Sequence, residues 1–80
     1  MVTLEYTSHR CELGSRIRQL RVEQGYSTRR FSVMIGISKT YLNRVETAKA
    51  SPTFEMLERI SAGLGVKPSD LVNFENDSQG

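Results

Sequence analysis

The chain has 80 residues, of which 38% are hydrophobic and 25% charged, and its formal net charge is +2. This length suits one small domain, and the composition is ordinary for a globular protein in water. No apolar run approaches the roughly 18 residues that cross a membrane, and a signal-peptide pattern is missing, so we expect a cytoplasmic protein that contacts no membrane. A single cysteine cannot form an internal disulfide, and without a Cys/His cluster we expect neither a metal nor another cofactor.

Charge is unevenly distributed along the chain. Residues 1–49 contain nine Lys/Arg and four Asp/Glu, a net charge of +5, whereas residues 50–80 contain two and five, a net charge of −3. A basic half next to an acidic half is typical of proteins with a polyanionic partner. Many surfaces separate charge without any function, so the pattern becomes informative only if the basic residues share one face.

The N-terminal segment shows a short alternation of apolar residues at Val2, Leu4 and Tyr6, followed by polar residues. We predict an extended N-terminal arm over residues 1–11, outside the main fold. A folded domain over residues 12–73 follows, and then a flexible polar C-terminal tail over residues 74–80.

Five short helices are predicted from apolar periodicity and from residues that begin or end helices. The boundary residues are, in chain order, Gly25 after the first helix, Ser27 and Gly36 around the second, Ser38 before the third at 39–47, Thr53 and Gly65 around the fourth, and Pro68 at the start of the fifth. No convincing pair of strands is present. The predicted fold class is therefore all-α, a compact bundle of five short helices packed through their apolar stripes.

The second and third predicted helices are joined by a very short turn at Gly36 and Ile37, which forces them to cross steeply. Ile37, Leu42 and Val45 anchor the third helix to the core. Its opposite side carries polar and cationic residues: Lys39, Thr40, Asn43, Arg44 and Thr47. Such a helix fits the DNA major groove, where Lys and Arg reach guanine and Asn pairs with adenine. The alternative for any single helix of this kind is an ordinary solvated face.

Three segments extend this observation over about three quarters of the chain: "LGSRIRQLRVEQGYS", "FSVMIGISKTYLNRVE" and "SPTFEMLERISAGLGVKPSDL". With them the chain resembles the phage repressor and Cro type of helix-turn-helix protein, the XRE family of bacterial regulators. The resemblance implies a lambda-repressor-like domain of five helices, in which the second and third form the DNA-reading unit.

The resemblance also implies roles for individual residues. Base contacts are expected at Lys39, Thr40 and Arg44, with Asn43 as a further candidate. Phosphate contacts are expected at these positions: Ser27, Thr28, Ser38 and Lys49. Because the family usually has a longer amide side chain where this chain has Thr28, we expect Arg29 or Arg30 to supply that contact, the alternative being that these two arginines form an ordinary solvated helix face.

Two structural features follow from the same resemblance. It implies an ion pair between Arg21 and Glu46 that joins the first helix to the end of the third, the alternative being two independent exposed charges. Ala48 stands where the family often has glycine, so a left-handed conformation there would cost about 1–2 kcal/mol.

A single domain with three or four base contacts offers little specificity, and repressors of this type resemble symmetric dimers on near-palindromic sites. We expect the dimer surface to come from the end of the domain: Val66, Pro68, Leu71 and Val72, with Phe74 as a further candidate. The alternative is that these residues close the core of a single copy.

The predicted function is sequence-specific binding of double-stranded DNA as a transcriptional regulator, without a small-molecule substrate. An enzyme is not expected, because the lone His9 has no nucleophile, carboxylate pair or phosphate-binding glycine loop beside it. The alternative is a protein-interaction module, such as an antitoxin or anti-repressor with a weakened helix-turn-helix. The apolar residues Val33 and Met34 and the N-terminal segment favour that alternative.

Overall fold

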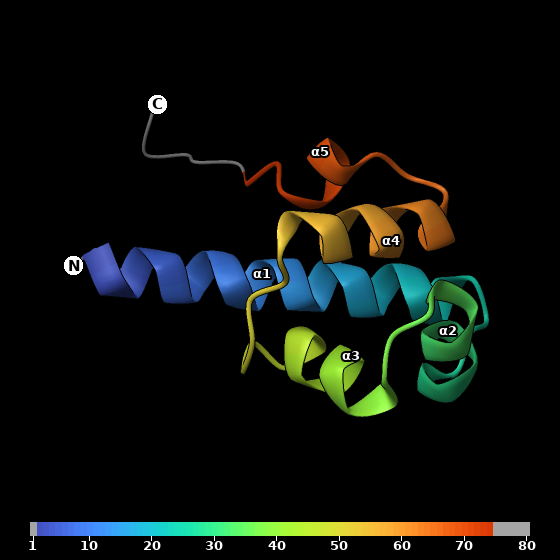
Figure 1. Ribbon diagram of the computed structural model, residues 1–80. Coiled ribbons are helices and arrows are strands. Elements are labelled where there is room, and N and C mark those ends of the chain that lie inside the picture. The colour runs from blue at the N-terminus through green and yellow to red at the C-terminus, as the bar shows by residue number, and fades with distance from the viewer. Residues whose placement is uncertain (1, 75–80) are drawn as a thin grey trace.

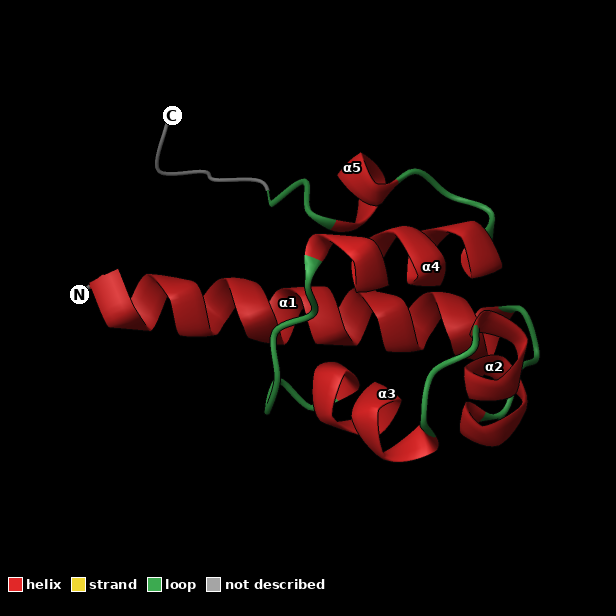
Figure 2. Cartoon of the chain, in the orientation of Figure 1, coloured by secondary structure: helices red, strands yellow, loops and turns green. Residues whose placement is uncertain are grey.

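The computed structural model describes residues 2–74, with side chains from residue 8 onward. This part of the chain contains only helices and connecting loops (Figures 1 and 2). The helices are α1 (Val2–Glu23), α2 (Thr28–Ile35), α3 (Lys39–Glu46), α4 (Phe54–Leu64) and α5 (Pro68–Leu71). The predicted all-α fold of five helices is confirmed. None of the helices within residues 2–74 is long and apolar enough to cross a membrane.

α1 lies in the middle of the molecule, with α4 along one side and α3 along the other (Figure 1). α5 covers the outer side of α4, and α2 closes the end of the bundle near the C-terminus of α1. The core contains the hydrophobic residues with 7% exposure or less: Leu13, Ile17, Phe31, Leu42, Val45, Ile60, Leu64 and Leu71. Because every helix except α1 is at most 11 residues long, this shared core is what keeps them helical in water.

The turn between α2 and α3 has the predicted chemistry. Gly36 ends α2 in the left-handed region, at φ 74° and ψ 35°, where a side chain would be strained. The next residue, Ile37, donates its N–H to the carbonyl of Ser32 at 3.0 Å. The Ser38 hydroxyl then accepts the N–H of Tyr41 at 3.0 Å and caps α3. Three residues, 36–38, therefore connect the end of α2 to the start of α3.

The prediction of an extended N-terminal arm is wrong for residues 2–11, which are helical and form the first turns of α1. No glycine or proline interrupts this segment, and a helix satisfies its own backbone hydrogen bonds, which a lone strand cannot do. These turns extend past the other helices in Figure 1, so the described chain measures 38 × 21 × 21 Å.

The C-terminal end of the described chain packs against this part of α1. The half-buried ring of Phe74, predicted to begin the flexible tail, stacks on the ring of His9 with 4.6 Å between centroids. Phe74 is therefore packed against the folded domain. The rest of the predicted tail, residues 75–80, lies outside the described residues.

Candidate nucleic-acid interface

The two sides of α3 differ sharply in exposure. Leu42 and Val45 are 0% and 1% exposed and fix the inner side of the helix to the core. The predicted base-contacting residues are all exposed on the outer side: Lys39, Thr40, Asn43 and Arg44. Since 100° separates successive residues of a helix, one short element can be anchored along one side and open along the other.

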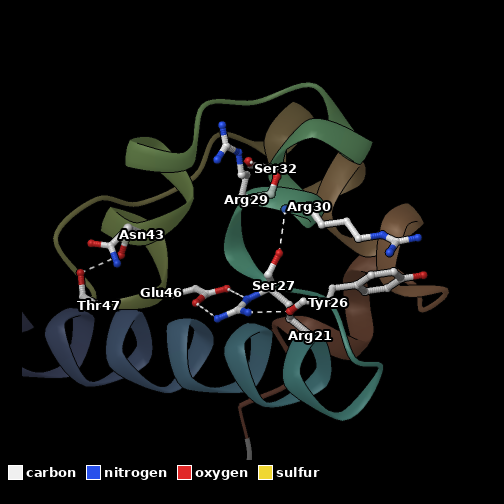
Figure 3. Close-up of polar contacts among 9 residues, drawn as sticks. All are labelled: Arg21, Tyr26, Ser27, Arg29, Arg30, Ser32, Asn43, Glu46 and Thr47. Carbon is white, nitrogen blue, oxygen red and sulfur yellow. Dashed lines mark hydrogen bonds and ion pairs between the residues drawn. The ribbon is translucent and has the colours of Figure 1, made fainter.

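The inner side of α3 is also fixed by the ion pair that the resemblance implied (Figure 3). Arg21 Nε donates to Glu46 Oε2 at 2.8 Å, and Arg21 Nη2 donates to Glu46 Oε1 at 2.9 Å. The two side chains are only 8% and 4% exposed. Arg21 Nη1 donates a further bond to the carbonyl of Tyr26 at 2.8 Å. One guanidinium thus connects α1, the end of α3 and the loop that leads into α2.

The hydrogen bond with Glu46 raises the pKa of Arg21 above its ordinary value, although burial acts in the opposite direction. A raised pKa in the folded state means that the stabilising contribution is complete below the unfolded-state pKa and is lost only as pH rises through the folded-state pKa. Because the ordinary arginine pKa is itself very high, Arg21 remains charged throughout the neutral range.

α1 and the C-terminal end of α3 approach each other very closely at Gly14. A Cβ atom at this position would lie 2.6 Å from the carbonyl oxygen of Val45 and 2.7 Å from that of Glu46. Backbone oxygens cannot move away as a flexible side chain can, so glycine is required here. Together with the ion pair, this contact determines how far the outer side of α3 projects.

The turn after α3 bends back onto Arg44. Ala48 has φ 64°, the left-handed conformation expected for this position, and Lys49 donates its N–H to the carbonyl of Arg44 at 2.7 Å. Arg44 Nη2 in turn donates to the carbonyl of Lys49 at 3.1 Å. The guanidinium is nevertheless exposed and keeps further N–H groups for a partner. The turn therefore holds Arg44 without covering it.

The predicted phosphate contacts lie at helix starts and in the loop after α3. The Ser27 hydroxyl accepts the N–H of Arg30 at 3.0 Å, as Ser38 does for α3. Each serine keeps its own hydroxyl hydrogen to donate to a phosphate. Arg29 and Lys49 are exposed, whereas Thr28 is half-buried. Thr28 is therefore shorter and less accessible than Arg29 and Arg30, which are both exposed at the start of α2.

The small polar residue Ser32 lies where α2 packs on its neighbours, and it is 2% exposed. Its hydroxyl donates to the carbonyl of Arg29 one turn earlier, at 2.8 Å. A hydroxyl that bonds back along its own helix needs no other partner, so serine is accommodated in the core at this position.

Comparison with known proteins agrees with this geometry. A family model described as helix-turn-helix matches residues 17–71, more than half of the chain. The chain belongs to the XRE family of helix-turn-helix proteins. The match contains α2 to α5 entirely, together with the part of α1 that carries Arg21.

Three relatives illustrate the similarity. The HTH-type transcriptional regulator SinR of Bacillus licheniformis is 34% identical over 68 residues, which cover 84% of this chain and 61% of that protein. The structure of the hypothetical transcription factor NHTF from Neisseria matches with a TM-score of 0.76 and 26% identity, and the match covers 88% of this chain and 79% of the NHTF chain. A structure of the SinR protein/SinI protein complex gives a TM-score of 0.72 at 30% identity, with coverage of 84% and 71%. This chain therefore spans about three fifths of the SinR sequence that it matches.

One residue of the predicted dimer surface is placed differently from the prediction. Leu71 is 0% exposed and belongs to the hydrophobic core, so it has no surface left for a second copy. Leu71 is the largest apolar side chain of the four-residue helix α5, and its burial packs that helix against the core. Val66 and Pro68 are half-buried and Val72 is 38% exposed. These three residues remain candidates for a dimer contact.

Two arginines that hold the ends of other helices were missed by the sequence reasoning. Arg59 Nη1 donates to the carbonyls of Ile35 and Gly36 at 3.4 and 3.2 Å, so it holds the C-terminus of α2, where a helix favours positive charge. Arg16 holds α5 in a similar way. Each arginine also pairs with a glutamate four residues earlier on its own helix, but the carbonyls that it holds lie more than 20 residues away, so no local pattern in the sequence indicated those contacts. Within residues 8–74, no group of three or more His, Cys, Asp and Glu side chains is placed to hold a metal ion.

Proposed function

We propose that this protein is a DNA-binding transcriptional regulator whose recognition helix is α3. The observation that carries the proposal is the contrast between the two sides of this helix. Its inner side is immobilised by the core and by the buried pair of Arg21 with Glu46. Its outer side presents only polar or cationic residues to water: Lys39, Thr40, Asn43 and Arg44. A rigid helix with such a face has the diameter and the donor groups that suit the major groove.

The relatives support the same function by their names, since SinR is a transcriptional regulator and NHTF a hypothetical transcription factor. The XRE family is a family of regulators rather than of enzymes. We therefore propose that occupancy of an operator regulates transcription, without a chemical step. The phosphates on either side of the bases would be bound by Ser27, Ser38, Arg29 and Lys49.

We also propose that two copies bind one operator. A single domain with a few base contacts discriminates poorly, and helix-turn-helix dimers gain specificity from two half-sites about 34 Å apart. The candidate contact surface contains Val66, Pro68 and Val72, on the side of the molecule away from α3. This arrangement predicts a near-palindromic binding site.

Selection of binding sites from random duplex DNA tests these proposals together, because it returns the preferred bases and their symmetry. The Arg44→Ala variant should lose about 1–3 kcal/mol of binding free energy at one base position in each half-site and accept other bases there. The Lys49→Ala variant should weaken binding to every sequence about equally, because a phosphate contact carries no base information. Unchanged sequence preference in Arg44→Ala would remove Arg44 from the set of base contacts.

A second candidate function is a module that binds another protein. It is favoured by the exposure of two adjacent apolar residues on α2, Val33 at 75% and Met34 at 46%. The SinR relative was solved in a complex with the SinI protein. If the selection returns no DNA motif, while loss of both apolar side chains abolishes capture of a partner from the source cell, the second function would replace the first.

A further inference from the structure

An open hollow of about 720 Å³ lies between α1 and α3, beside the outer face of the recognition helix. Asn43 of α3 and Thr47, the residue after α3, line it on one side, and Ser15 and Arg18 line it from α1. In Figure 3, Asn43 and Thr47 lie above α1, with the Arg21–Glu46 pair further along the same gap. The hollow therefore joins the proposed base-contacting surface to a helix that has no assigned part in binding.

The charges around the hollow favour an anion near Arg18. Glu46 is one of its two acidic residues, and its carboxylate is already paired with Arg21. The other, Glu23, lies at the C-terminal end of α1 and accepts a hydrogen bond from Gln19 at 3.1 Å. Glu23 follows Arg18 by five residues, about 7.5 Å along the helix axis. Arg18 is exposed, and within residues 8–74 no hydrogen-bond or ion-pair partner holds its side chain.

The diameter of α3, compared with the width of the major groove, indicates which neighbouring residues would lie near the DNA phosphates. A helix with side chains is about 10–12 Å across, and the major groove is about 12 Å wide. When a helix fills the groove, the phosphates at the groove's edges come against the elements that flank the helix. α1 flanks α3 across the hollow, and Arg18 is the described cation that lines it from α1.

We propose that Arg18 binds a backbone phosphate of the DNA and that the nucleic-acid surface therefore extends across the hollow onto α1. The inference rests on the proposed function, because it assumes that α3 enters the major groove. The contact adds affinity without sequence preference, since a phosphate is the same at every base pair. Ser15 and Asn43 line the same hollow as Arg18 and can donate further hydrogen bonds to a phosphate. An ion pair between Arg18 and an acidic side chain would prevent this contact.

The test is the salt dependence of binding to one operator duplex and to one unrelated duplex. Each neutralised phosphate contributes about −0.9 to the slope of log K against log salt. The Arg18→Gln variant should therefore reduce the magnitude of the slope by about 0.9 and weaken binding about fivefold near 0.15 M salt, on both duplexes alike. Arg18→Lys, which keeps the charge, should restore the slope. Since Arg18 is exposed, both variants should retain the parent's melting temperature.

Lys67→Gln is the matched control, because Lys67 is an exposed cation at the start of α5, which lies on the side of the bundle opposite α3. It should leave the slope unchanged. A slope that is also unchanged in Arg18→Gln, in a protein that binds DNA, would overturn this contact alone. A changed base preference in Arg18→Gln would overturn it as a phosphate contact. Failure of the parent protein to bind any duplex would instead overturn the proposed function and this contact with it.

Discussion

Two short helices on opposite sides of the bundle, α3 and α5, are both held by an arginine of α1, but in different ways (Figure 1). Arg21 holds α3 through the carboxylate of Glu46, and both side chains are less than a tenth exposed. Arg16 holds α5 through main-chain carbonyls: Asp70 at 3.2 Å, Leu71 at 2.8 Å and Asn73 at 3.2 Å. Its side chain is 27% exposed and also pairs with Glu12.

The difference follows from the length and exposure of each helix. α3 has eight residues, and its outer side is exposed, so the contacts that fix it to the bundle lie on its inner side. A buried bidentate pair has one geometry and thereby sets the orientation of the outer face. α5 has four residues and leaves its last carbonyls without partners in the helix, so a cation at its C-terminus can bind them in addition to the packing of Leu71 in the core. The orientation of α3 thus depends on the buried Arg21, whereas the half-buried Arg16 holds α5 against the bundle.

The largest effect is expected from removal of one partner of the buried pair. Glu46→Ala should lower the free energy of unfolding by about 3–5 kcal/mol, because the charge of Arg21 would remain buried without its partner. Thermal or denaturant unfolding measures this loss. Glu58→Ala, at an exposed position of α4, is the control and should change stability by less than about 0.5 kcal/mol. If both variants unfold alike, Arg21 and Glu46 are not coupled.

A smaller effect is expected on the other side of the comparison. Arg16→Met keeps most of the side-chain volume but loses the hydrogen bonds to the three carbonyls, and should cost about 1–2 kcal/mol after allowance for partial exposure. Faster amide hydrogen exchange should appear in α5 and not in α3. Glu12→Gln removes only the i,i+4 pair with Arg16 and should cost about 0.3–0.5 kcal/mol. Loss of protection in α3 would contradict the separate roles of the two arginines.

The smallest effect is expected at the turn that follows α3. Ala48→Gly should stabilise the protein by up to about 1 kcal/mol, because relief of a left-handed alanine, about 1–2 kcal/mol, is partly offset by the greater freedom of glycine in the unfolded chain. The same exchange at Ala62, inside α4, should instead destabilise by about 1 kcal/mol. A lower melting temperature for Ala48→Gly would show that the turn after α3 is rebuilt in the variant.

Much of the fold could be predicted because its signals are local. The capping residues Ser27, Ser38 and Thr53 act on N–H groups three residues away, and Gly36 ends α2 as its position indicated. The exposed outer face of α3 also followed from helical periodicity alone. The pair of Arg21 with Glu46 spans 25 residues, and it was expected from the family resemblance rather than from any local pattern.

The errors have physical causes of their own. The alternation at Val2, Leu4 and Tyr6 indicated an extended arm, but three alternating residues cannot select a strand that has no partner strand. Residues 2–11 continue the helix instead. Leu71 was expected on a dimer surface, with the core as the alternative. In the structure it is buried in the core, where it packs the four-residue helix α5 against the bundle. Sequence alone could not rank these two uses, because both require the same kind of side chain.

The sequence by itself determined where α2, α3 and α4 begin and end, how sharply α2 turns into α3, and which side of α3 remains polar, since all three depend on residues within a turn or two of one another. Only the tertiary structure decided that Arg16 and Arg59 hold helices 20 or more residues away, that Gly14 sets the distance between α1 and α3, and that Arg18 lies across a hollow from Asn43. Those relations arise when the apolar stripes pack together. The periodicity of the sequence does not predict which polar residues of different helices become neighbours when the helices pack.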